Sequence, residues 1–137
     1  MKKKNVLLIL FTFSILVLVS LACDFSFSTA EISNAYMSID ENGNTPTSVY
    51  GSSDVFYCIV ETQNAPDSTV VKVEWYAVDV DLEDVQPNTY LDEVEVEGSG
   101  VLTFSFSNAN LWPNGTYRTD IYINGEFDQS VEFSVSD

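Results

Sequence analysis

Apolar and polar residues alternate in short runs along most of this chain, and clusters of turn-forming residues separate the runs. The run at 70–80 is the clearest, because Val71, Val73 and Trp75 fall on one face while Lys72 and Glu74 fall on the other. No segment after residue 30 carries a convincing period of 3.6 residues. A period of two is typical of half-buried strands, so the pattern predicts an all-β domain.

Seven such runs lie between residue 31 and the end of the chain. They predict strands near residues 32–40, 54–61, 70–80, 90–98, 101–107, 115–123 and 126–135. Asn124-Gly125 joins the last two and matches a type I′ hairpin turn, which needs positive φ at both central positions. About seven short strands with this patterning indicate an antiparallel β-sandwich.

The first 22 residues have a different character. Lys2, Lys3 and Lys4 precede an uncharged apolar run from residue 6 to residue 22. A basic start followed by an apolar core is typical of a secretory signal, and we expect it to be helical. The run is at the short edge for a membrane span, which needs about 20 apolar residues. A retained transmembrane anchor is the alternative.

The end of this run, Ser20-Leu21-Ala22-Cys23, resembles the lipobox of bacterial lipoproteins. The segment differs from the usual lipobox at Ser20, a position where leucine is most common. The resemblance implies lipid transfer to the Cys23 thiol and cleavage between Ala22 and Cys23. Residues 1–22 would then be a signal peptide, 23–30 a lipidated tether and 31–137 the folded domain. It also implies attachment to a bacterial membrane or envelope, with the domain facing outside the cytoplasm and the lipid as the contact with the bilayer.

The charge balance narrows the choice of partners. The chain has 5 basic and 21 acidic residues, and three of the basic ones lie in the signal. Lys72 and Arg118 then remain against 21 acids, a formal net charge of −19 (2 minus 21). Such a domain repels nucleic acids and anionic headgroups, so we expect no nucleic-acid partner. Solubility, or life at high salt, is the alternative explanation of the acidity.

Landmarks inside the expected strands resemble those of an immunoglobulin-like sandwich. Cys58 lies in the second expected strand and Trp75 in the third, while the segment 114–119, Asn-Gly-Thr-Tyr-Arg-Thr, resembles a tyrosine corner with Tyr117 as its tyrosine. Thr119 stands where such domains carry their second cysteine, which implies that no disulfide joins the sheets. Residues 111–135 also resemble the closing part of Ig-like modules in uncharacterised bacterial surface lipoproteins, which implies location and fold only. Cys58 is then a buried thiol, with a reactive thiol as the alternative.

Two groups of oxygen-bearing side chains are candidate Ca²⁺ sites. The first comprises Asp79, Asp81, Glu83 and Asp84, and the second comprises Asp40, Asn42 and Asn44. Closely spaced oxygen ligands in a loop suit Ca²⁺, but neither group fits the EF-hand pattern. Chance clustering in a very acidic chain is the alternative, and no other cofactor is expected.

Trp112, before Pro113-Asn114-Gly115, is a candidate ligand-binding residue at a strand corner. An exposed tryptophan there would stack on a sugar or anchor a protein, whereas a buried one would cap the core. The outward tyrosines Tyr76 and Tyr122 share this ambiguity.

Catalysis has little support in the sequence. The chain contains no histidine and no nucleophile elbow, phosphate-binding glycine loop or zinc pattern. We therefore expect a non-enzymatic, lipid-anchored module with a binding or structural role at the cell envelope, and an unidentified protein or glycan partner. The alternative is an accessory lipoprotein that captures glycans or other substrates through exposed aromatics such as Trp112.

Overall fold

The computed structural model describes residues 29–137, which form eight strands and no helix. The signal helix expected within residues 1–22 lies outside the described residues. The strands are β1 (Glu31–Ser38), β2 (Val49–Tyr50), β3 (Phe56–Gln63), β4 (Val70–Val80), β5 (Thr89–Glu97), β6 (Val101–Phe106), β7 (Gly115–Ile123) and β8 (Glu126–Val135). Nothing helical in this described part is long and apolar enough to cross a membrane.

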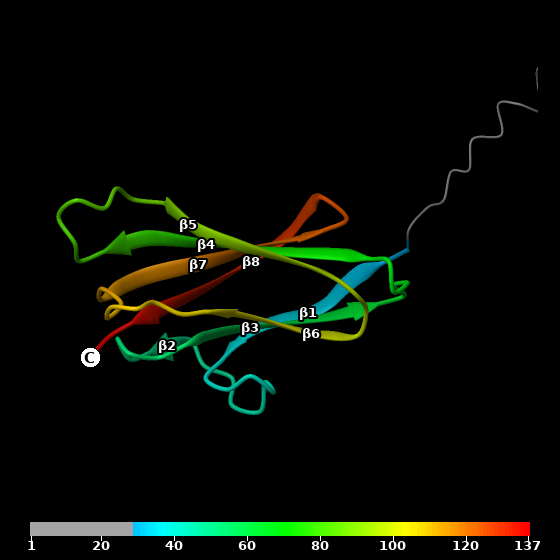
Figure 1. The fold of residues 1–137 in the computed structure, drawn as a ribbon, viewed down its shortest axis with the longest axis horizontal. Helices are drawn as coiled ribbons and strands as arrows, with labels where there is room; N and C mark the ends of the chain where they lie inside the picture. Colours follow the sequence, from blue (N-terminus) through cyan, green and yellow to red (C-terminus); the bar gives the residue numbers. More distant parts are fainter. Residues whose placement is uncertain (1–28) are drawn as a thin grey trace, which may run out of the picture.

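The strands form two sheets packed face to face (Figure 1). One sheet has the order β1-β3-β6, and the other has the order β2-β8-β7-β4-β5. All neighbours are antiparallel except β2 and β8, which are parallel. The expected antiparallel β-sandwich is therefore confirmed.

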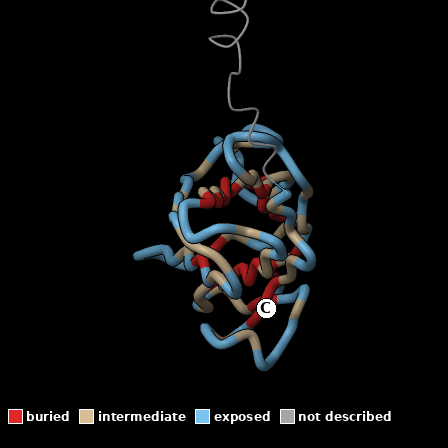
Figure 2. Tube along the Cα trace, turned by 90° about the vertical axis from the view of Figure 1, so that its right-hand side faces the viewer, coloured by how far each residue is buried: buried red, intermediate tan, exposed pale blue. Residues whose placement is uncertain are grey.

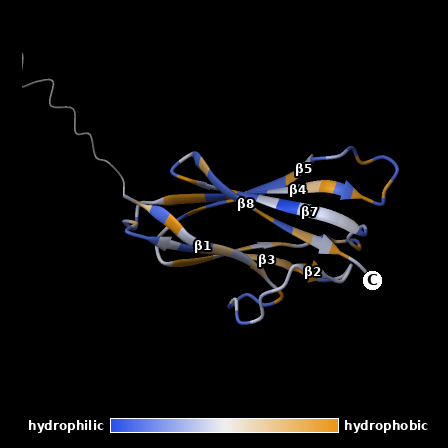
Figure 3. Cartoon of the chain, turned by 180° about the vertical axis from the view of Figure 1, so that it is seen from behind, coloured by the Kyte–Doolittle hydropathy of each residue, from blue (hydrophilic) through white to orange (hydrophobic). Residues whose placement is uncertain are grey.

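The core fills the space between the sheets, as the burial colouring in Figure 2 shows. The hydropathy view in Figure 3 shows the alternation along the strands that produces it. The faces predicted from the period of two are those observed: Val71, Val73, Trp75 and Ala77 of β4 are buried. Other fully buried side chains are Tyr50, Phe56, Cys58, Phe104, Tyr117, Ile121 and Val135.

Strand β2 was not predicted. It has two residues, and the turn-rich segment 41–48 precedes it, so it offers no period to detect. It pairs only with β8, which is distant in the sequence: the amides of Ser134 and Ser136 donate to the carbonyls of Ser48 and Tyr50. Tyr50 is buried, and its hydroxyl donates to the Ser38 carbonyl at 2.7 Å. The first part of the chain therefore crosses from one sheet to the other.

The hairpin prediction is confirmed by the backbone. Asn124 has φ 49° and Gly125 has φ 82°, so both central residues adopt positive φ. The turn joins Ile123 to Glu126, which are paired in the ladder.

The strands divide the loops between two opposite ends. The chain enters at Glu31, which pairs with Gln63, and this end also carries the 64–69, 98–100 and 124–125 connections. We call it the entry end. The far end carries the loop 81–88, the loop 107–114 and the C-terminus (Figure 1). Because β4 has 11 residues, the two ends lie about 34 Å apart along this strand.

Candidate functional site

The acidic segment after β4 lies in the loop at the far end. Backbone hydrogen bonds fix its course: the Asp81 amide donates to the Asn114 carbonyl at 2.8 Å, and the Val85 amide donates to the Leu82 carbonyl at 3.1 Å. The side chains of Asp79, Asp81, Glu83 and Asp84 are exposed. No three acidic, cysteine or histidine side chains come together as metal ligands anywhere in residues 29–137. This finding argues against the Ca²⁺ site expected at these four residues.

The second Ca²⁺ candidate is a capped turn. The Asp40 carboxylate accepts hydrogen bonds from the amides of Asn42, Asn44 and Thr45, the last at 2.7 Å. Burial would raise the pKa of Asp40, but hydrogen bonds from Asn44, Thr45 and Asn42 outweigh it and lower the pKa. The carboxylate therefore caps the backbone of this turn, and the Ca²⁺ site suggested here stays a prediction.

Trp112 is a core residue. Its side chain is 7% exposed, and its ring stacks on Phe56 with centroids 4.4 Å apart. The indole N–H donates to the Asp54 carbonyl at 2.9 Å. Of the two interpretations of Trp112, the structure therefore supports the buried one, in which the indole caps the end of the core, and not the exposed one that would stack on a sugar.

An apolar pocket opens beside Trp112, at the far end between the two loops. Its volume is about 180 Å³. Its walls are Ala77, Val80, Leu82, Val85, Leu91, Asn108, Trp112, Pro113 and Tyr117. We call this the far-end pocket. The side chain of Leu82 stands at 52% exposure, and the nearby Leu111 at 67%. Two separate candidates from the sequence, the acidic segment and Trp112, thus meet at one place.

The tyrosine corner fixes one wall of the pocket. The Tyr117 hydroxyl donates to the Pro113 carbonyl at 2.7 Å, as the resemblance implied. Burial raises the pKa of Tyr117 to about 12. Gly115, two residues earlier, has φ +146°, and a Cβ there would lie 2.3 Å from the Asp79 carbonyl oxygen. Only glycine lets loop 107–114 approach β4 this closely.

The two cations of residues 29–137, Lys72 and Arg118, lie on the outer face of the five-stranded sheet. Lys72 pairs with Glu74 and, at 3.7 Å, with Glu93. Arg118 donates two hydrogen bonds to Asp120, at 2.8 and 3.1 Å. Arg118 also donates to the Asn88 side-chain oxygen in loop 81–88 at 3.1 Å, but within residues 29–137 neither cation forms an ion pair with Asp79, Asp81, Glu83 or Asp84.

The outward tyrosines belong to the same network. Tyr76 and Tyr122 donate to the Glu74 carboxylate at 2.8 and 3.1 Å. Lys72 lies 4.4 Å from the centre of the Tyr122 ring, and Arg118 lies 4.8 Å from that of Tyr76. Burial would raise the pKa of Glu74, but hydrogen bonds from Lys72, Tyr76 and Tyr122 lower it. These side chains are satisfied by one another.

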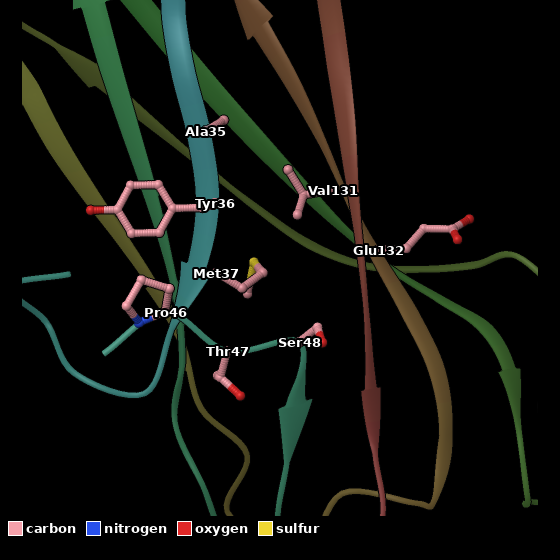
Figure 4. Close-up of a pocket in the computed structure, with 8 residues that line it drawn as sticks. All are labelled: Ala35, Tyr36, Met37, Pro46, Thr47, Ser48, Val131 and Glu132. Atoms are coloured by element: carbon pink, nitrogen blue, oxygen red, sulfur yellow. The ribbon is translucent and has the colours of Figure 1, made fainter. Parts of the chain in front are cut away.

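A wider groove of about 380 Å³ runs between β1 and β8. In Figure 4, Met37 and Val131 lie between the two strands, while Tyr36 points away from Val131. Pro46, Thr47 and Ser48 close its lower end, where β2 begins to pair with β8. Glu126, Asp128 and Glu132 stand exposed along the uncovered part of β8. Charged side chains on an edge strand discourage pairing with a further strand, so this groove is a blunted sheet edge.

Cys58 is a free, buried thiol on β3. Burial, only partly opposed by a hydrogen bond with Thr119, raises its pKa to about 12. A thiol in this state is not a nucleophile at neutral pH. The lipidation and cleavage residues, Cys23 and Ala22, lie outside the described residues.

The far-end pocket escaped the sequence analysis because its walls come from five separate elements, namely β4, loop 81–88, β5, loop 107–114 and β7. The sequence contains only a partial indication of the pocket. Leu82 and Val85 stand among the acidic residues of one loop, and Leu111 precedes Trp112 in the other. Apolar residues in two exposed loops suggest a surface, but only the register of β4 with β7 brings those loops together.

Comparisons with known proteins show the fold alone. No family model matches the chain, and no curated protein matches it. Among solved structures, an immunoglobulin-like protein from Pseudomonas aeruginosa is similar, with a TM-score of 0.51 and 12% sequence identity. The match covers 78% of this chain and 96% of that one. The domain of residues 31–137 is thus an Ig-like β-sandwich.

Proposed function

We propose that this protein is a lipid-anchored, extracytoplasmic module of the bacterial envelope that binds another molecule at the far-end pocket. The observation that carries the proposal is the position of this pocket at the end opposite the chain entry. An anchor at Cys23 would place the entry end toward the bilayer. The pocket would then face away from the membrane, where a partner can reach it.

The proposed role is binding and not catalysis. The pocket walls are apolar except for Asn108 and Tyr117. The Tyr117 hydroxyl is already bonded to Pro113, and the chain has no histidine to act as a general base. A concave apolar site with few polar groups is typical of ligand recognition.

The anchor is tested by expressing the full chain in a bacterium and analysing the membrane-extracted protein by mass spectrometry. We expect a chain that begins at Cys23 and carries acyl groups. The Cys23→Ala variant removes the acceptor thiol, and we expect it to retain residues 1–22. An unmodified Cys23 in the wild-type protein would contradict the anchor but leave the pocket untouched.

The pocket is tested separately with the processed protein in nanodiscs. Benzyl alcohol, a small neutral apolar probe, is titrated while the indole N–H resonances of the two tryptophans are followed by NMR. Trp112 lines the pocket and Trp75 does not, so we expect only the Trp112 resonance to shift. Leu82→Ser should weaken the effect, whereas Val101→Ser, an exposed apolar residue at the entry end, should not. Identical titrations of Trp112 and Trp75 would overturn the pocket.

A second candidate is glycan capture by the outer face of the five-stranded sheet. It is favoured by Tyr90 and Phe127, which are 49% and 57% exposed and pack against Tyr76 and Tyr122 respectively. Aromatic rings on an exposed sheet face suit stacking on sugars. A glycan array would show binding that Tyr90→Ala and Phe127→Ala abolish; no binding to any glycan would eliminate this candidate.

A further inference from the structure

We infer that the far-end pocket receives an apolar side chain from a basic segment of another protein, and that the acidic loop 81–88 holds the flanking cations. The inference rests on the proposed binding function and names its partner class. It is carried by an apolar cavity and uncompensated carboxylates on the same loop, together with the distance of this site from the chain entry.

The size of the pocket sets what enters it. A volume of about 180 Å³ equals the share of roughly six water molecules in the liquid, at about 30 Å³ each. This is room for one branched aliphatic or phenyl side chain. Leu82 stands half exposed at the mouth and would lose contact with water when the pocket is filled. Burying its apolar surface would favour the complex.

Charge selects the flanking residues of the partner. In the loop, Leu82 lies between Asp81 and Glu83, and Asp84 follows directly. Asp79 precedes them in β4, one residue before the strand ends. All four are exposed. Lys72 and Arg118 form ion pairs with Glu74 and Asp120 on the outer face, and Arg118 also donates to Asn88 of this loop at 3.1 Å. Neither cation of the described domain forms an ion pair with the four carboxylates. An approaching Lys or Arg would find carboxylates that are close to the pocket mouth and unpaired.

The N-terminal tether is too short to be the occupant. The tether residues 24–30 reach at most about 25 Å when fully extended, whereas the strand β4 alone separates the two ends by about 34 Å. The N-terminal tether therefore cannot reach the far-end pocket of its own chain. If residues 1–22 were retained, this length limit would not apply. A mass spectrum of the preparation is therefore recorded before binding is measured, to show whether these residues have been removed.

The experiment uses the processed full chain in nanodiscs of neutral lipid and three fluorescein-labelled peptides. The first peptide has a central Leu-Phe pair flanked by four lysines. In the second the lysines are replaced by glutamines, and in the third the Leu-Phe pair is replaced by Ser-Ser. Fluorescence anisotropy gives the Kd at about 50 and about 300 mM NaCl, a range over which surface charge is progressively screened. We expect only the first peptide to bind well, and more weakly at the higher salt concentration.

Two sets of variants carry the same charge change at opposite ends. Asp81→Asn, Glu83→Gln and Asp84→Asn together neutralise the loop. Glu95→Gln, Glu97→Gln and Glu126→Gln neutralise three exposed acids toward the entry end. We expect the first set to raise the Kd about tenfold and the second to change it less than about twofold. Leu82→Ser should raise it by a similar factor without affecting folding, because its side chain is half exposed.

Each of the other outcomes refutes a specific part of the inference. Equal losses in the two triple variants would mean that general acidity attracts the peptide, and the inference fails. Equal binding of the glutamine peptide would leave the pocket standing but exclude a basic partner. Equal binding of the Ser-Ser peptide would remove the pocket from the interaction. Binding of none of the three, alongside a positive benzyl alcohol titration, would refute this partner class and spare the proposed function.

Discussion

The side chains of Thr119 and Cys58 are neighbours across the interface between the two sheets, and Thr119 partly offsets the rise that burial causes in the pKa of the Cys58 thiol. Cys58 lies on β3 and Thr119 on β7, and neither is exposed. In an Ig domain these positions carry the intersheet disulfide. Here a thiol and a hydroxyl replace it, so the packing of the two sheets holds the sandwich together.

This juxtaposition predicts that Thr119→Cys creates a disulfide with Cys58. Closing a loop of this length lowers the entropy of the unfolded chain, and we expect a gain of about 2–4 kcal/mol in the free energy of unfolding. Urea unfolding with and without dithiothreitol measures it, and mass spectrometry shows the loss of two hydrogens. Thr119→Val, which cannot form the bond, serves as the control and should show no effect of reductant.

Gly115→Ala should be strongly destabilising. Its Cβ would lie 2.3 Å from the Asp79 carbonyl oxygen and 2.6 Å from the Val80 Cα, so the loop and β4 must separate. Gly125→Ala also requires positive φ, but it meets no atom within 4 Å. We expect about 1 kcal/mol for Gly125→Ala and a clearly larger loss for Gly115→Ala. Equal losses in thermal unfolding would show that the contact with β4 is not important.

Tyr117→Phe should lower the free energy of unfolding by about 1 kcal/mol, because it removes the hydrogen bond to the Pro113 carbonyl. The ring stays in place against Phe133, with centroids 5.6 Å apart, so the core should remain filled. Tyr90→Phe removes a hydroxyl from a half-exposed ring and provides the matched comparison. Chemical denaturation of both variants decides the point; a neutral Tyr117→Phe would contradict the role of the corner.

Stability should fall at alkaline pH. Burial raises the pKa of Cys58 to about 12 and that of Tyr117 to about 12, and it raises the pKa of Tyr50 further. The folded state therefore holds these protons more tightly than the unfolded chain does. The contribution is complete below the ordinary pKa values, about 8.5 for a thiol and 10 for a phenol, and is lost as the pH rises toward 12.

Urea midpoints at pH 7, 9 and 11 measure this dependence. We expect a small change between pH 7 and 9 and a larger decrease between pH 9 and 11. Cys58→Ala should flatten the first part of the curve, since the thiol titrates first in the unfolded chain. A midpoint that is constant up to pH 11 would contradict the burial of these three groups.

The fold was predictable from the sequence because each long strand has one buried face. Val71, Val73, Trp75 and Ala77 occupy every second position of β4, and this pattern needs no tertiary information. The Asn124-Gly125 turn was equally local, since its residue types determine its φ values. Strand β2 was not predictable, because its two residues pair only where β8 happens to pass.

The candidate site was predictable only in pieces. Oxygen ligands in an acidic loop suggested Ca²⁺, yet spacing along the chain does not determine whether carboxylates converge. Trp112 was singled out as an aromatic at a corner, but its burial depends on Phe56, which is 56 positions away in the sequence. A pocket between two loops is a property of the register of their strands, which composition does not record.

The opposite placement of the chain entry and the far-end pocket has a mechanical consequence. If the tether is pulled toward the bilayer while a partner holds the far end, the load runs parallel to the strands. The ladder between β1 and β3, from Glu31 with Gln63 to Ser38 with Tyr57, is then loaded in shear. Hydrogen bonds that lie across the strands must all stretch together under this load, whereas peeling would break them one at a time. With the proposed anchor and partner in place, the domain would therefore resist tension between the membrane and the far end better than a domain pulled open strand by strand.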